Sequence, residues 1–94
     1  MPDNLLERRR VWYAGRVQGV GFRATTLRIA ARHAVTGFVQ NLPDGRVLVV
    51  VEGEADEIGR FLADVRTTLS RYIRGEDQAA EAPTGEFAAF DVRF

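Results

Sequence analysis

Hydrophobic and polar positions change their spacing several times along this chain, and each change marks the start of another element. Alternate positions from Val11 to Val17 are apolar or glycine, which predicts a strand. From Phe22 to Ala34 the apolar positions recur every three to four residues, with Arg28 and Arg32 opposite them, which predicts a helix. A glycine-rich turn connects the two elements.

The next two segments predict a hairpin. Thr36 to Asn41 reads as a strand, Leu42 to Gly45 contains a Pro-Asp-Gly turn signal, and Arg46 to Glu52 carries a run of valines typical of a strand. A second helix is predicted after Gly53, because apolar residues there recur at helical spacing: Ile58, Phe61, Leu62, Val65 and Leu69.

The C-terminal part gives a less regular pattern. From Tyr72 to Pro83, charged residues and alanines replace the alternation of apolar and polar residues. The sequence therefore does not decide whether a fourth strand forms there. Alternation returns from Phe87 to Phe94, which predicts a terminal strand with Phe90, Val92 and Phe94 on one face.

This order of elements predicts an α+β fold with two layers. A strand, a helix, two strands, a helix and one or two strands are typical of the ferredoxin-like α/β sandwich (βαββαβ), an antiparallel sheet with two helices on one face. Right-handed crossovers would place the first and third strands side by side at its centre. We expect residues 1–94 to form a single domain, with residues 1–7 as a flexible tail.

The composition excludes several classes of function. The 13 basic and 13 acidic residues balance, which argues against nucleic-acid and membrane-surface binding. No apolar run could span a membrane and no signal peptide is evident, so we expect a cytoplasmic protein. All basic residues are arginine, which excludes a Walker A loop and Schiff-base catalysis. The chain has no cysteine and one histidine, which excludes thiol chemistry and His-rich zinc sites.

The glycine-rich segment from Gly15 to Arg23 is the main candidate for chemistry. Its sequence, GRVQGVGFR, could form a cradle of backbone N–H groups for one phosphate, or simply a tight connection from strand to helix. Arg23 favours the cradle, because a cation beside the positive end of a helix is unfavourable unless an anion binds there.

Three other polar residues have two readings each. Asn41 either caps its own turn or presents an amide to a water molecule near the glycine loop. Thr26 either fills space on the inner side of the first helix or supports the site from behind. His33 lies on the apolar face of that helix and is expected to be packed rather than catalytic. No spacing of acidic residues or histidine suggests a metal, so we expect neither metal nor cofactor.

Two long motifs resemble the acylphosphatase family. They are GRVQGVGFR followed by Thr26, and TGFVQNLPDG from Thr36 to Gly45. The similarity extends from Val11 to Leu69, and the final FDVRF also fits. The resemblance implies a ferredoxin-like enzyme that hydrolyses the carboxyl–phosphate bond of acyl phosphates.

The resemblance also implies a role for particular residues. Arg23 matches the phosphate-binding arginine of the family, and Asn41 matches the residue that positions the attacking water. The residues that match the backbone phosphate cradle are Arg16, Val17, Gln18, Gly19, Val20, Gly21 and Phe22. Two departures are Ala34, where many members have glycine, and Tyr72 to Pro83, which lacks the family's Gly-Pro and its valine-bearing fourth strand.

A site with so few reactive side chains suits this chemistry. The leaving group is a carboxylate whose acid has a pKa near ~4, so it departs without a general acid. Positioning and charge stabilisation then suffice for direct attack by water. We expect a small-molecule acyl phosphate as substrate, inorganic phosphate as product and inhibitor, and a monomer or weak dimer.

Other functions remain open at this point. The chain could be a non-catalytic module that binds phosphate or carbamoyl phosphate, since related domains head the hydrogenase-maturation carbamoyltransferases. An RNA-binding role is disfavoured by the neutral charge. Arg8 to Arg10 is interpreted as a solvated strand edge or frayed terminus, with a binding tail as the alternative. On the face away from the helices we expect an apolar patch that could serve as a dimer contact, formed by Trp12, Phe38, Leu48 and Val50.

Overall fold

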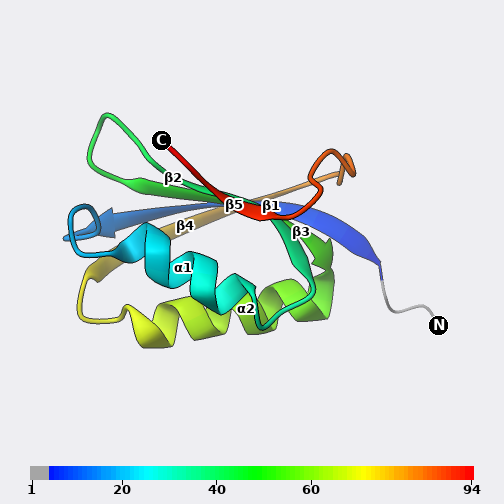
Figure 1. Ribbon diagram of the computed structural model, residues 1–94, viewed down its shortest axis with the longest axis horizontal. Helices are drawn as coiled ribbons and strands as arrows, with labels where there is room; N and C mark the ends of the chain where they lie inside the picture. Colours follow the sequence, from blue (N-terminus) through cyan, green and yellow to red (C-terminus); the bar gives the residue numbers. More distant parts are fainter. Residues whose placement is uncertain (1–4) are drawn as a thin grey trace.

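The computed structural model describes residues 5–94, which form a five-stranded sheet with two helices packed on one face (Figure 1). In chain order the elements are β1 (Leu6–Gly15), α1 (Phe22–Ala30), β2 (Val35–Asn41), β3 (Val47–Glu54), α2 (Ala55–Thr68), β4 (Ile73–Glu81) and β5 (Phe90–Arg93). The ferredoxin-like order of elements is confirmed.

The sheet has the strand order β4-β1-β3-β2-β5. β1 and β3 are neighbours at the centre, as the crossover rule predicts. β4, β1, β3 and β2 pair antiparallel, whereas β5 runs parallel to β2. The sheet is therefore mixed rather than purely antiparallel, and β5 brings the end of the chain beside the end of β2.

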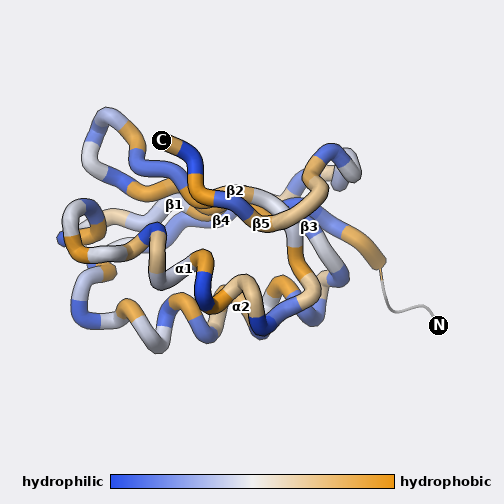
Figure 2. Tube along the Cα trace, viewed as in Figure 1, coloured by the Kyte–Doolittle hydropathy of each residue, from blue (hydrophilic) through white to orange (hydrophobic). Residues whose placement is uncertain are grey.

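The main core lies between the sheet and the helices. Apolar positions recur along both helices (Figure 2), and their buried side chains meet every second residue of the central strands. Tyr13, Val49 and Phe61 illustrate this layer, because none of them is exposed to solvent. Burial also raises the pKa of the Tyr13 hydroxyl well above its ordinary value.

A second, smaller core occupies the opposite face of the sheet. Phe38, Leu48 and Val50 are buried there, with Trp12 and Phe87 packed against them. The expectation of an exposed patch is wrong for these three residues, because Trp12, Leu42 and Phe87, the last from the segment between β4 and β5, pack against them. The sequence could not show this, since that segment has no regular pattern.

Several element boundaries differ from the sequence-based expectation. α1 ends at Ala30 rather than Ala34, because the following residues form turns in which the His33 N–H bonds to the Ala30 carbonyl at 3.0 Å. The His33 ring lies between Glu57 and Asp64 of α2 (3.0 and 2.7 Å), so this corner is fixed by tertiary contacts. His33 is packed, as expected.

The N-terminal segment also differs. Leu6 and Glu7 belong to β1, so the expected tail to residue 7 is wrong at these two positions, while residues 1–4 lie outside the described residues. Arg8 is 9% exposed and is not part of a solvated strand edge. It is buried because β1 lies between β3 and β4 and its charge is paired. The open question of a fourth strand is resolved by β4, an edge strand with mostly exposed side chains.

Candidate active site

The glycine loop leads from the end of β1 directly into the N-terminus of α1. Gly19 (φ 78°) and Gly21 (φ 79°) both adopt the left-handed conformation that other residues rarely adopt. Gly21 is the N-cap of α1, no side chain caps the helix, and its first turn contains no acidic residue. The first N–H groups of a helix have no partner within it, so this end of α1 can receive an anion.

The base of the loop is held tightly against β4. The Arg16 N–H donates to the Tyr72 carbonyl at 2.9 Å. A Cβ at Gly15 would lie 2.4 Å from that same carbonyl oxygen, so only glycine allows this approach. The loop therefore starts from a fixed point, although its tip is exposed.

Arg23 is the second residue of α1 and points toward the end of β5. One guanidinium nitrogen donates to the Arg93 carbonyl at 3.2 Å, and the guanidinium carbon lies 4.7 Å from the centre of the Phe94 ring. Within residues 5–94 the Arg23 side chain forms no ion pair. Its positive charge is thus oriented by β5 and available to an anion.

Asn41 ends β2 on the side of the sheet that faces the helices. Its Oδ1 is buried and has no hydrogen-bond partner among the described residues. Buried side-chain oxygens are nearly always partnered in folded proteins, by protein or by water. An unpartnered oxygen at this position is therefore a place where a water molecule or ligand can donate a hydrogen bond.

A pocket of about 440 Å³ brings these features together. Gly19, Gly21, Arg23 and Asn41 supply its polar part. Its remaining walls are apolar and come from Val17, Phe22, Ala24, Leu27, Val92 and Phe94. Arg16, Gln18, Val20 and Thr26 are not part of its lining.

Gln18 occupies a different position from the one its place in the loop suggests. Its side-chain nitrogen donates to the carbonyl oxygens of Leu42 (2.8 Å) and Arg46 (2.9 Å), which flank the β2–β3 turn. The side chain thereby connects the glycine loop to the β2–β3 turn, which begins just after Asn41. Sequence reasoning treated Gln18 only as a part of the cradle.

Thr26 lies in the core rather than at the pocket. It is fully buried, and its hydroxyl has no hydrogen-bond partner among the described residues. Val92 and Phe94, by contrast, line the pocket and were not predicted as site residues. The alternation of the last strand could have suggested them only if its parallel pairing beside β2 had been known.

Together the fold and the pocket define an α+β domain with a pocket at the start of α1, bordered by Arg23 and Asn41. No three His, Asp or Glu side chains among residues 5–94 are grouped so that they could hold a metal ion, and no helix in that range is long and apolar enough to cross a membrane. The expected cytoplasmic location stays a prediction.

Comparison with known proteins identifies the family. The acylphosphatase family model matches residues 9–92. An acylphosphatase from Methylococcus capsulatus is 46% identical over 89 residues, which cover 93% of this chain and 96% of that protein. The chain belongs to the acylphosphatase family.

Two solved structures show the same fold. The crystal structure of acylphosphatase from Bacillus subtilis matches with a TM-score of 0.84 and 25% identity, covering 96% of this chain and all of that one. A phosphate- and nucleotide-bound structure of full-length HypF matches with a TM-score of 0.82 and 25% identity, but only 12% of that chain is covered.

Proposed function

We propose that this chain hydrolyses the carboxyl–phosphate bond of acyl phosphates and releases a carboxylate and inorganic phosphate. One observation carries the proposal: among residues 5–94, a helix N-terminus without a side-chain cap, an arginine without a carboxylate partner and a buried, unpartnered Asn41 Oδ1 all border one pocket. Family membership and the names of the relatives agree with it.

In this proposal the phosphate oxygens bind to the N–H groups of the glycine loop and the first turn of α1. The Arg23 guanidinium binds the same group from the β5 side. These donors are fixed before the substrate arrives, so they stabilise negative charge on the phosphoryl oxygens without reorganising during the reaction. The proposed cradle comprises Arg16 to Phe22 together with Arg23, and the pocket lining favours Gly19 and Gly21 as its centre.

The proposed nucleophile is a water molecule that donates a hydrogen bond to Asn41 Oδ1. Its oxygen attacks phosphorus opposite the acyl oxygen, forming one P–O bond while the P–O bond to the acyl group breaks. The electron pair of that bond leaves with the carboxylate, and a phosphate oxygen accepts the proton of the water. No side chain has to change its protonation state, because a carboxylate is a good leaving group.

The pocket also indicates what surrounds the acyl group. Leu27 and Phe94 are exposed apolar side chains at its rim, 38% and 96% exposed. We propose a small-molecule acyl phosphate as substrate and inorganic phosphate as a competitive inhibitor, since phosphate would occupy the same donors. We propose further that the chain is a monomer or weak dimer.

Hydrolysis of benzoyl phosphate by the wild type and by Arg23→Ala tests the proposal. The wild type should show saturable turnover, and Arg23→Ala should lose it, because the phosphate then lacks the guanidinium that borders the pocket. A wild type that binds phosphate without turnover would instead identify a non-catalytic module. Undiminished turnover in Arg23→Ala would overturn the phosphate site.

A further inference from the structure

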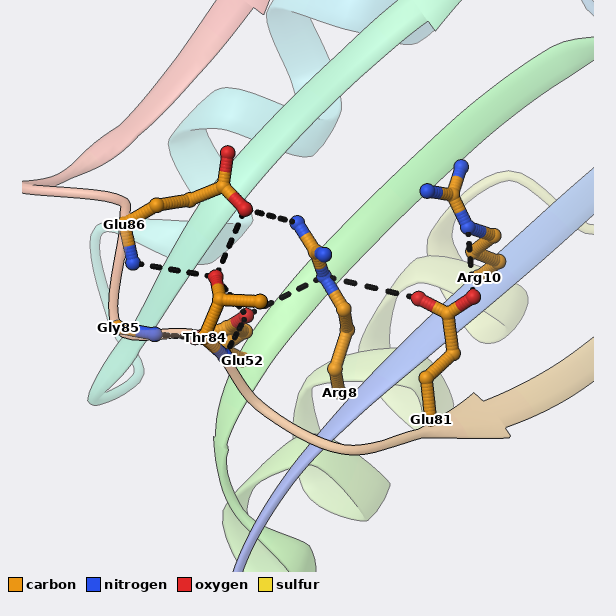
Figure 3. Close-up of polar contacts among 7 residues, drawn as sticks. All are labelled: Arg8, Arg10, Glu52, Glu81, Thr84, Gly85 and Glu86. Carbon is orange, nitrogen blue, oxygen red and sulfur yellow. Dashed lines mark hydrogen bonds and ion pairs between the residues drawn. The ribbon is translucent and has the colours of Figure 1, made fainter.

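The end of the sheet far from the pocket contains a carboxylate that is buried yet fully used. Glu52, on β3, is 5% exposed. It accepts hydrogen bonds from the Thr84 N–H (2.9 Å), the Gly85 N–H (2.9 Å) and the Thr84 hydroxyl (3.1 Å). Arg8 Nε lies 3.2 Å from the same carboxylate (Figure 3). Glu52 thus joins β1 and β3 to the strap, which we define as residues 82–89 between β4 and β5.

Other contacts strengthen this connection. A terminal nitrogen of Arg8 donates to Glu86 at 3.1 Å (Figure 3). The same Glu86 oxygen lies 2.7 Å from the Thr84 hydroxyl, whose single proton is shared between Glu86 and Glu52. Glu81, at the end of β4, pairs with Arg8 and Arg10 at 3.8 and 3.0 Å. We call Arg8, Glu52, Thr84, Gly85 and Glu86 the anchor cluster, because it holds the strap against the two central strands.

Between the anchor cluster and β5, the strap is held by contacts of the Phe87 ring and by a backbone hydrogen bond. The Arg8 guanidinium lies 5.0 Å from the centre of the Phe87 ring, which contacts Phe38 edge-on at 5.9 Å. The Ala89 carbonyl then accepts a hydrogen bond from the Gly37 N–H at 3.0 Å, and β5 begins at the next residue.

β5 packs its Phe90 and Val92 against the main core, with Phe90 edge-on to Phe61 at 5.5 Å, but its backbone is paired on one side only. It is four residues long, lies at the edge of the sheet and pairs with β2 alone. Short edge strands open at low free energy in folded proteins. Its far end nevertheless carries Val92 and Phe94 of the pocket and the Arg93 carbonyl that binds Arg23.

We propose that Arg8 and Glu52 are positioning residues for the phosphate site: by fixing the strap they keep β5 docked, and docked β5 keeps Arg23 oriented. The link to catalysis rests on the proposed function, whereas the docking of β5 does not. If phosphate binds only when β5 is docked, its apparent dissociation constant is the intrinsic value divided by the docked fraction. Saturating substrate then restores docking, so losing the anchor raises KM and leaves kcat nearly unchanged.

Two variants of different severity test this. Glu52→Gln removes the charge opposite Arg8 in the buried pair. Thr84→Val removes only the exposed Thr84 hydroxyl, with its bonds to Glu52, to the Glu86 carboxylate and from the Glu86 N–H. Glu76→Gln is a matched control, because Glu76 forms an equally close pair with Arg66 of α2 (3.1 and 2.8 Å) that does not involve the strap or β5. If Glu52→Gln fails to fold, the milder Thr84→Val decides whether the anchor cluster affects β5.

The expected result is a rise in the KM for benzoyl phosphate of roughly fivefold in Glu52→Gln and about twofold in Thr84→Val, with kcat retained. Glu76→Gln should leave KM unchanged even if its melting temperature falls as much as that of Glu52→Gln. Hydrogen exchange at the amides of residues 90–93 should become faster in the two anchor variants and return to the wild-type rate with inorganic phosphate.

Two outcomes would overturn the proposal. One is unchanged exchange at residues 90–93 in Glu52→Gln. The other is an equal rise of KM in Glu52→Gln and in the Glu76→Gln control. Exchange without phosphate requires no turnover, so it decides the docking of β5 even if the wild type does not hydrolyse acyl phosphates.

Discussion

The two ends of the sheet differ in whether their buried oxygen atoms have hydrogen-bond partners. At the pocket, Asn41 Oδ1 is buried without a partner among residues 5–94, and no side chain in that range caps the start of α1. At the anchor cluster, Glu52 accepts three hydrogen bonds and pairs with Arg8. Both ends are rich in polar groups, so polarity alone does not identify the functional end. An unpartnered acceptor that borders a pocket does, since Thr26 Oγ1 and Arg8 Nε are also buried without a hydrogen-bond partner among residues 5–94 but do not line the pocket.

The energetics of the two ends differ accordingly. An unpartnered buried polar group costs about 1–3 kcal/mol, a cost that a bound water or substrate removes. A buried ion pair contributes little net stability, but removing one partner is strongly destabilising because the other charge remains. Changes at the pocket should therefore alter the reaction, and changes at the anchor cluster should alter stability and the docking of β5.

The strongest test of this contrast is Asn41→Ala. Removing the amide that orients the water should lower kcat about 100-fold, the usual cost of losing one positioned polar group. The dissociation constant of inorganic phosphate should change little, since the N–H groups and Arg23 remain. Stopped assays with benzoyl phosphate and titration calorimetry with phosphate measure the two quantities. Loss of phosphate affinity equal to the loss of rate would make Asn41 a binding residue instead.

A smaller effect is expected when the link between the two halves of the site is removed. Gln18→Ala deletes both hydrogen bonds from the glycine loop to the β2–β3 turn. We expect kcat to fall roughly tenfold, because the loop can then shift relative to Asn41. Gln18→Glu should be at least as slow, since its carboxylate would face two carbonyl oxygens. A kcat equal to that of the wild type in Gln18→Ala would show that the backbone alone sets the loop.

Acid should affect the anchor end first, through stability. Burial alone would raise the pKa of Glu52, but the hydrogen bonds from Thr84 and Gly85 and the charge of Arg8 outweigh it and hold this pKa below its ordinary value of 4.5. A lowered folded-state pKa means that the contribution to stability is fully present above pH 4.5 and is lost as the pH falls through the folded-state value.

Urea unfolding at several pH values measures this contribution. Between about pH 5 and pH 3 the free energy of unfolding should fall more steeply in the wild type than in Glu52→Gln, which has no such carboxylate to protonate. Equal slopes would mean that the Glu52 carboxylate contributes nothing specific to folding. Glu86, also in the anchor cluster, has a pKa held below its ordinary value, mainly by the hydrogen bond from the Thr84 hydroxyl. The free energy of unfolding of Glu52→Gln should therefore still fall somewhat as the pH is lowered.

The smallest expected effect is that of a chelator. The proposed mechanism uses only N–H groups, Arg23 and Asn41 on the phosphate, so EDTA should leave kcat and KM unchanged. Assays before and after dialysis against EDTA measure this directly. A loss of activity that returns with a divalent cation would require another account of how charge on the phosphate is stabilised.

The first half of the chain was predictable because its signals are local. The glycine loop, the helix that follows and the Pro-Asp-Gly turn each act over a few residues, so Arg23 and Asn41 could be found from the sequence. That they border one pocket follows from the predicted topology, which places the loop and the end of β2 at the same end of the sheet.

The second half was less predictable because tertiary contacts decide it. β4 lacks alternation since most of its side chains are exposed at the edge of the sheet. The role of Arg8 depends on Glu52 and on the strap, more than forty residues away in the sequence. Val92 and Phe94 reach the pocket only because β5 pairs parallel to β2, which no short-range pattern encodes.

The parallel docking of β5 has a consequence for how the molecule acquires activity. The pocket is built from the glycine loop, the end of β2 and the last strand, so it is complete only when contacts between distant parts of the sequence have formed. Contacts of this kind close slowly during folding, because the intervening chain must first be ordered. Recovery of phosphate binding after dilution from denaturant should therefore follow the final step of folding, and the ligand itself becomes a probe of when the last strand arrives.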